Sequence, residues 1–243
     1  MTAITPHNKF LLITFITAGL VLTSTLFARE MFFNVSAQDL QTSKSLYGVK
    51  YQDQKDYFEV IPSKVKKPNT AVIFYPGALV DSKAYAPKLA SVASTVGVKV
   101  FILKPSLRLA DLDIKSANQI IKYNRDITNW YVGGHSMGGG AACNFANHNQ
   151  DLINGLILFA AYCSDNDKKY AGSTLLFYGS DDPLEPLHKL RTKIPKYTTI
   201  VVIQGASHAS FGDYGNQPFD GKQTKSDQSI AKIFAQKLKN FVK

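Results

Sequence analysis

The residues best suited to chemistry lie in Gly134-His135-Ser136-Met137-Gly138, which follows the pattern G-x-S-x-G. In this pattern a sharp turn from a strand into a helix lifts the serine hydroxyl clear of the sheet. The two glycines leave room where any side chain would crowd neighbouring backbone. The helix begins at the serine, so its positive end faces negative charge that develops there. The motif predicts that Ser136 is a nucleophile.

A serine hydroxyl needs a general base at neutral pH, and histidine is the usual one. The sequence contains five histidines. Four of them lie before the first strand, inside the motif or within predicted helices: His7, His135, His148 and His188. The side chain of His135 is expected to point away from the nucleophile. His208 directly follows the last predicted strand, in the segment QGASH, and is therefore the predicted base.

The base in turn needs an acid that holds its tautomer and stabilises its cation. In sites of this type the acid lies between the serine and the histidine in the chain. The segment YGSDDPLEP, residues 178–186, follows a predicted buried strand at that place. Asp182 is the predicted acid. Asp181 is the alternative, and Glu185 is a weaker third candidate.

An oxyanion hole requires two backbone N–H groups aimed at the reacting oxygen. One belongs to the residue after the nucleophile, Met137, and the other to the loop after an earlier strand. That loop reads PGALV, residues 76–80. Gly77 is expected to let the backbone turn close to the substrate, so Ala78 is the predicted second donor and Leu79 the alternative.

These residues must be positioned by strands and helices that alternate along the chain. Apolar, β-rich runs predict strands at residues 57–61, 70–75, 98–103, 130–132, 156–160, 174–178 and 199–203. Helical spacing predicts helices at residues 82–96, 113–124, 141–147, 185–192 and 226–243. This alternation predicts an α/β fold whose mostly parallel sheet carries helices on both faces. In such sheets the site lies at the carboxyl ends of the strands, where all the motifs above are found.

The connection from Ala161 to Ser173 is too short to hold a separate cap domain over the site. Without a cap, little apolar wall is available to bury a long acyl chain. The sequence therefore predicts an open site that favours short acyl groups, or a small headgroup on a larger substrate.

The N-terminus has the pattern of an export segment. Lys9 is followed by FLLITFITAGLVLTSTLFA, residues 10–28, which carries no charge. Such a run is typical of a secretory signal, and it is also nearly long enough to span a bilayer. Both readings of residues 1–28, cleaved signal and membrane anchor, place the protein outside the cell or facing outside. Val35-Ser36-Ala37 is the predicted cleavage site if the segment is cleaved, and Ala28 is a poorer alternative because Leu26 lies two residues before it. Residues 29–48 are expected to form a tether and residues 49–243 the folded domain.

The formal net charge of +10 fits lysines that solubilise the surface, and it would also draw the protein to anionic surfaces such as cell-wall polymers. The lysines are scattered and no nucleic-acid motif is present, so no nucleic-acid partner is expected. The two cysteines, Cys143 and Cys163, lack metal-ligand spacing to a histidine, and no metal is expected. Cys143 should lie well down the helix after Ser136, while Cys163 should lie near the upper end of the sheet. We therefore expect their Cα atoms to exceed the separation of about 7 Å that a disulfide allows, leaving two free thiols.

Residues 57–242 resemble the α/β-hydrolase superfamily, and in particular its small, capless, dienelactone-hydrolase-like members. The resemblance rests on four segments: YPGALVDSKAYAP, GGHSMGGG, YGSDDPLEP and GASHASFGDYG. It implies hydrolysis of esters or related acyl compounds, with no metal and no organic cofactor. Ser136, Asp182 and His208 match the triad positions of this group. Dienelactone hydrolases proper have cysteine as the nucleophile, so their substrate specificity does not carry over.

Three functions follow from these observations. The first is an exported hydrolase that cleaves small-molecule carboxylic esters through an acyl-Ser136 intermediate. The second is acyl transfer to an alcohol on the same residues. The third is a non-catalytic surface-binding domain, against which the complete set of serine, acid, histidine and oxyanion elements argues.

Overall fold

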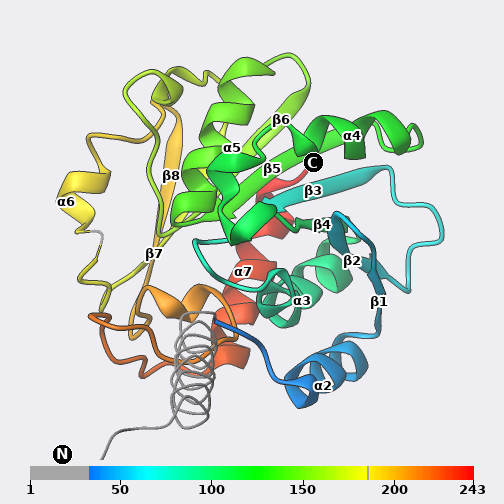
Figure 1. Ribbon diagram of the computed structural model, residues 1–243, viewed down its shortest axis with the longest axis horizontal. Coiled ribbons are helices and arrows are strands. Elements are labelled where there is room, and N and C mark those ends of the chain that lie inside the picture. The colour runs from blue at the N-terminus through cyan, green and yellow to red at the C-terminus, as the bar shows by residue number, and fades with distance from the viewer. Residues whose placement is uncertain (1–32, 185) are drawn as a thin grey trace, which may run out of the picture. The chain divides into compact units, whose positions relative to one another are not determined.

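The computed structural model describes residues 33–184 and 186–243, in which an eight-stranded sheet has the order β1-β2-β4-β3-β5-β6-β7-β8 (Figure 1). The strands are β1 (Val49–Asp53), β2 (Tyr57–Pro62), β3 (Thr70–Tyr75), β4 (Lys99–Leu103), β5 (Asn129–His135), β6 (Ile153–Phe159), β7 (Thr174–Gly179) and β8 (Thr198–Ile203). The pairings of β2 with β1 and with β4 are antiparallel, and all later pairings are parallel. The parallel strands therefore end at one edge of the sheet.

Helices cover both faces of this sheet, as Figure 1 shows. They are α2 (Ala37–Tyr47), α3 (Ala86–Val96), α4 (Ser116–Tyr123), α5 (Met137–His148), α6 (Leu187–Leu190) and α7 (Asp227–Phe241). Single 3₁₀ turns are η1 (Ser82–Tyr85), η2 (Ser106–Arg108), η3 (Ala110–Leu112), η4 (Asp167–Lys169) and η5 (Ala209–Phe211). The predicted fold class is confirmed, and only η4 lies between β6 and β7, where a cap domain would be inserted.

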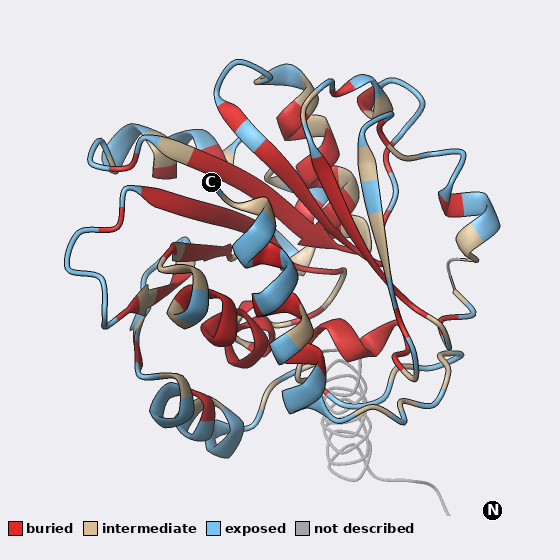
Figure 2. Cartoon of the chain, turned by 180° about the vertical axis from the view of Figure 1, so that it is seen from behind, coloured by how far each residue is buried: buried red, intermediate tan, exposed pale blue. Residues whose placement is uncertain are grey.

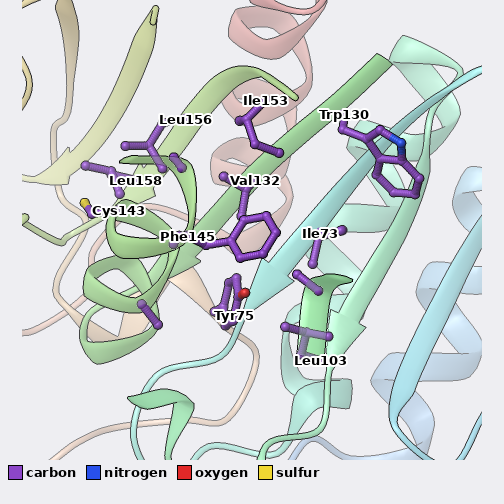
Figure 3. Close-up of a cluster of buried hydrophobic side chains, with 14 of the residues drawn as sticks. Ile73, Tyr75, Leu103, Trp130, Val132, Cys143, Phe145, Ile153, Leu156 and Leu158 are labelled. Carbon is purple, nitrogen blue, oxygen red and sulfur yellow. The ribbon is translucent and has the colours of Figure 1, made fainter. Parts of the chain in front are cut away.

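Strand β3 shows why the centre of the sheet must be covered twice, because all its residues are buried. Ile73 and Tyr75 join the hydrophobic cluster beneath α4 and α5, which Figure 3 shows around Phe145. Phe74 points to the opposite face, where its ring lies 5.0 Å from that of Tyr85. The alternation of side chains along a strand thus sends neighbouring residues into two different cores. Figure 2 shows the same burial along the other central strands.

The closing helix α7 occupies most of residues 226–243, where helical spacing predicts a helix. Its N-cap is Ser226, whose side chain accepts a hydrogen bond from the N–H of Ser229. Phe234 stacks on Phe159 with ring centroids 4.5 Å apart and meets Phe177 at 4.9 Å. The apolar face of α7 therefore packs on the sheet, directly below the segment that carries His208.

The expectation that residues 29–48 form a tether is wrong for Ala37–Tyr47, because these residues form the helix α2. Ser36 caps this helix by accepting from the N–H of Asp39, and Gly48 ends it in the left-handed conformation with φ 59°. The helix is polar almost throughout and leaves Leu46 56% exposed, so no apolar stripe revealed it. The suggested cleavage site at residues 35–37 coincides with the start of this helix.

The export segment, residues 1–28, lies outside the described residues. Among the residues that the structure does describe, no helix is both long enough and apolar enough to cross a membrane.

Candidate active site

Ser136 occupies a strained turn between β5 and α5, with φ 52° and ψ −123°. Its N–H donates to the carbonyl of Phe159 at 3.0 Å, which ties the turn to the end of β6. A Cβ atom on Gly134 would overlap the carbonyl of Gly138, and one on Gly138 would overlap that of Tyr75. Both glycines are therefore required by close backbone approach, and strain of this kind is concentrated at functional sites.

Asp182 and His208 form a buried pair at the same edge of the sheet. Oδ2 of Asp182 lies 2.8 Å from Nδ1 of His208, and the two residues are 4% and 2% exposed. Oδ1 of Asp182 accepts the N–H of Leu184 at 2.9 Å. A carboxylate held in this way orients the imidazole and stabilises its cation, leaving Nε2 for proton transfer.

The alternative acid, Asp181, is turned away from the histidine. Its Oδ1 accepts a hydrogen bond from the hydroxyl of Ser180 at 2.8 Å, on the surface of the protein. Of the adjacent carboxylates, the structure thus brings Asp182 to His208. The third candidate, Glu185, lies outside the described residues.

Asp220 is a part of the site that sequence reasoning missed. Its carboxylate accepts the backbone N–H of His208 at 2.9 Å and that of Ala209 at 2.6 Å. These bonds fix the backbone at the start of η5 and so complete the support of the histidine. Asp220 lies in a loop without periodicity, and no motif distinguishes it from the other surface aspartates.

Some backbone N–H groups of the loop after β3 already donate a hydrogen bond within the protein, and others do not. Three of them donate within the protein: Gly77 to Oη of Tyr85, Leu79 to the carbonyl of Arg108, and Val80 to that of Gly77. The N–H of Ala78 has no acceptor among the described residues, and the same holds for Met137 at the start of α5. These two open amides are the predicted oxyanion donors, whereas the alternative, Leu79, is engaged elsewhere.

A cavity of about 540 Å³ opens beside the nucleophile. Its wall comes from η3, α5 and the segment after β6, and includes Ser136, Met137, Gly140, Ala160, Ala161 and Tyr162. Asp111 and Asp167 are the charged side chains in this wall. The carboxylate of Asp167 is held by Asn144 and Ser164, both neutral.

The expectation of two free thiols is wrong, because Cys143 and Cys163 form a disulfide with a Cα–Cα distance of 5.5 Å. The error lies in the path of the chain after β6. Instead of staying at the upper end of the sheet, the chain turns back along α5, so that Ala161 lies against Gly139. Cys163 thereby reaches Cys143, and both are fully buried.

His135 is buried behind the nucleophile and faces away from the cavity. Its Nδ1 lies 2.9 Å from Oη of Tyr85, and its ring centroid lies 4.6 Å from that of His208. Burial, and then the charge of His208, hold the pKa of His135 well below its ordinary value. His135 is therefore neutral in the range in which a catalytic histidine titrates.

No set of three or more His, Cys, Asp or Glu side chains within the described ranges is grouped so that it could hold a metal ion.

Residues 71–232 match a family model described as "Alpha/beta hydrolase family". The fold is similar to that of Est1E from Butyrivibrio proteoclasticus, with TM-score 0.59 and 14% identity over 79% of this chain and 98% of that one. It is also similar to the fold of a predicted CIB-like hydrolase from Thermoplasma acidophilum, with TM-score 0.57 and 17% identity over 79% of this chain and 100% of that one. For an esterase from Pyrobaculum calidifontis, the TM-score is 0.55 and the identity 14%, over 84% of this chain and 91% of that one. No curated protein sequence matches the chain.

Proposed function

The chain belongs to the α/β-hydrolase family, and from this premise we propose that it hydrolyses carboxylic esters through an acyl-Ser136 intermediate. The observation that carries the proposal is the buried Asp182–His208 pair, which lies at the same sheet edge as a strained serine and two open amides. A nucleophile, a base, an acid and two oxyanion donors are the groups that acyl transfer through a serine requires.

The proposed reaction begins when Oγ of Ser136 attacks the ester carbonyl while Nε2 of His208 accepts the hydroxyl proton. The oxyanion that forms is stabilised by the N–H groups of Met137 and Ala78. The protonated histidine then gives its proton to the departing alcohol, and an acyl-Ser136 ester remains. Water, deprotonated by His208, attacks this ester, and the protonated histidine returns its proton to Oγ of Ser136 as the carboxylic acid is released.

The substrates that suit the cavity are esters with small acyl groups. Its wall includes the carboxylates of Asp111 and Asp167, so an anionic acyl group would meet negative charge on entering. A neutral or cationic group would not. The absence of a cap between β6 and β7 favours short chains over lipid-like ones.

We also propose that the protein acts outside the cytoplasm. Two observations support this: the uncharged run at residues 10–28 after Lys9, and the disulfide between Cys143 and Cys163, a bond typical of oxidising compartments.

The test of the enzymatic proposal is hydrolysis of p-nitrophenyl acetate by the protein without residues 1–28. Ser136→Ala should lower kcat by roughly 10⁴–10⁶. The matched control is Ser91→Ala, because this serine is buried between α3 and α7, where its hydroxyl bonds the carbonyl of Ala231. The control should retain activity within a few-fold. Equal activity in both variants would refute the proposal.

A further inference from the structure

Tyr85 and His135 form a polar pair that is enclosed behind the nucleophile. Tyr85 is 0% exposed and His135 is 1% exposed. The rings around them are those of Phe74, Tyr214 and Phe211, with centroids 5.0, 6.4 and 5.7 Å from the nearer member. A buried polar pair in such surroundings is costly unless its groups are satisfied, which makes its bonds informative.

The hydroxyl of Tyr85 joins the oxyanion loop to the elbow. It accepts the N–H of Gly77 at 2.9 Å, so its own hydrogen is available for Nδ1 of His135, also at 2.9 Å. This arrangement satisfies the Gly77 amide, the hydroxyl and Nδ1, and it places the proton of the neutral imidazole on Nε2, which is buried without a hydrogen-bond partner among the described residues. One hydroxyl therefore holds a loop amide and an imidazole at once.

The pair of Tyr85 and His135 explains why residue 77 is a glycine. A Cβ atom at this position would lie 2.9 Å from Nδ1 of His135 and 3.0 Å from Oη of Tyr85. The glycine thus lets the loop backbone approach the pair, whereas the sequence suggested that it makes room for the substrate. With the Gly77 amide fixed, the next amide along the loop, that of Ala78, is left open.

The other side of His135 faces the proposed base. The two histidine rings are 4.6 Å apart with an interplanar angle of 46°, and Phe211 stacks on His135 at 29°. His208 is thus held at Nδ1 by Asp182 and is packed against the tilted ring of a neutral histidine. A charged ring in this place would repel the imidazolium that forms during the reaction, whereas a neutral one does not.

We propose that Tyr85 and His135 are positioning residues for this site: Tyr85 fixes the oxyanion loop through Gly77, and His135 fixes the ring of His208. The proposal rests on the proposed function, because it assigns the pair to the same reaction. It predicts that the two residues affect kcat while touching no substrate atom.

The first test is Tyr85→Phe, which removes one oxygen and keeps the ring. The kcat for p-nitrophenyl acetate should fall roughly 10- to 100-fold, since a small displacement of a catalytic group has effects of this size. KM should stay within a few-fold. The affinity for butylboronic acid, which forms a tetrahedral adduct on the serine, should fall in step with kcat. A purely structural role would lower the melting temperature without this parallel loss.

The second test separates the role of His135. The Nδ1 proton that His208 shares with Asp182 should give a low-field NMR signal. His135→Ala should broaden that signal and lower kcat at least tenfold, while His135→Phe, which restores a ring, should recover much of the signal. Tyr85→Phe should leave the signal in place.

Gly77→Ala provides a second test in case Tyr85→Phe fails to fold. It crowds Tyr85 and His135 without removing a polar atom. It should reproduce the loss of kcat and of boronic acid affinity. The inference is overturned if folded Tyr85→Phe and Gly77→Ala both keep wild-type kcat and boronic acid affinity while Ser136→Ala is inactive. Activity in Ser136→Ala would instead refute the proposed function itself.

Discussion

Oδ2 of Asp182 lies 2.8 Å from Nδ1 of His208, although the neighbouring Asp181 has the same carboxylate one residue earlier. The side chain of Asp181 bonds Ser180 on the surface instead. Of these two adjacent residues, Asp182 can therefore orient the proposed base and Asp181 cannot.

This relationship predicts different effects of the two amide substitutions. Asp182→Asn should lower kcat by about 10³–10⁴, because an amide favours the wrong tautomer of His208. Asp181→Asn is the matched control and should cost less than about tenfold by the same comparison. The measurement is ester hydrolysis at neutral pH with both folded proteins. The reverse order of effects would identify Asp181 as the acid.

The disulfide predicts that the unfolded, non-reduced protein contains no free thiol. The bond closes a loop with a sequence separation of 20, so its loss should lower the free energy of unfolding by about 3 kcal/mol. Cys143→Ala with Cys163→Ala should show this loss in urea unfolding. The double variant should also lose activity, since the bond holds the cavity wall at Ala161 and Tyr162 against α5. Titration of two thiols in the native chain would contradict the bond.

His135 predicts a loss of stability in mild acid. Burial lowers its pKa in the folded protein, whereas the unfolded chain takes up a proton below about pH 6.5. The folded state binds fewer protons, so stability is complete above that pH and decreases as the pH falls toward the folded pKa. Below about pH 6.5 and above the folded pKa, the slope should approach that of one proton, about 1.4 kcal/mol per pH unit.

His135→Asn should remove this dependence. The comparison is needed because Glu59 and Asp213, whose pKa values are raised by burial, act with the opposite sign. Their contribution decreases as the pH rises above about 4, and it is shared by both proteins. The same slope of unfolding free energy against pH in the two proteins would show that His135 is protonated when folded.

The cavity predicts a preference for short acyl chains. No cap covers the cavity between β6 and β7, and its wall is partly polar. Each methylene beyond about hexanoate should therefore gain less than the roughly 0.8 kcal/mol that full burial provides. The values of kcat/KM for p-nitrophenyl esters from acetate to palmitate should therefore be highest at the short end. A maximum at laurate or longer, or a sharp rise at the micelle threshold, would reveal a lipid-binding wall.

The local motifs were predictable from sequence because their chemistry requires residues close together in the chain. The elbow around Ser136 depends on two glycines and on a strand that leads directly into a helix. His208 and Asp182 each follow a strand of the parallel part of the sheet, and parallel strands bring such positions to one edge. These relationships hold even when the predicted ends of the strands and helices are wrong by a few residues.

Other parts depend on paths that no local pattern encodes. The disulfide was missed because the turn of the chain along α5 after Ala160 is a tertiary feature. Asp220 supports His208 from an irregular loop, and α2 is too polar to show a buried stripe. The role of Tyr85 required knowledge that its hydroxyl reaches both Gly77 and His135.

The central claim, that Ser136 becomes acylated, is tested most directly by mass spectrometry of the protein after reaction with a fluorophosphonate. The account predicts one adduct per chain, located by peptide sequencing at Ser136, and no adduct in the His208→Ala variant within the same reaction time, because the serine then lacks its base. An adduct on another residue, or an unlabelled Ser136 in a protein that hydrolyses esters, would contradict the account.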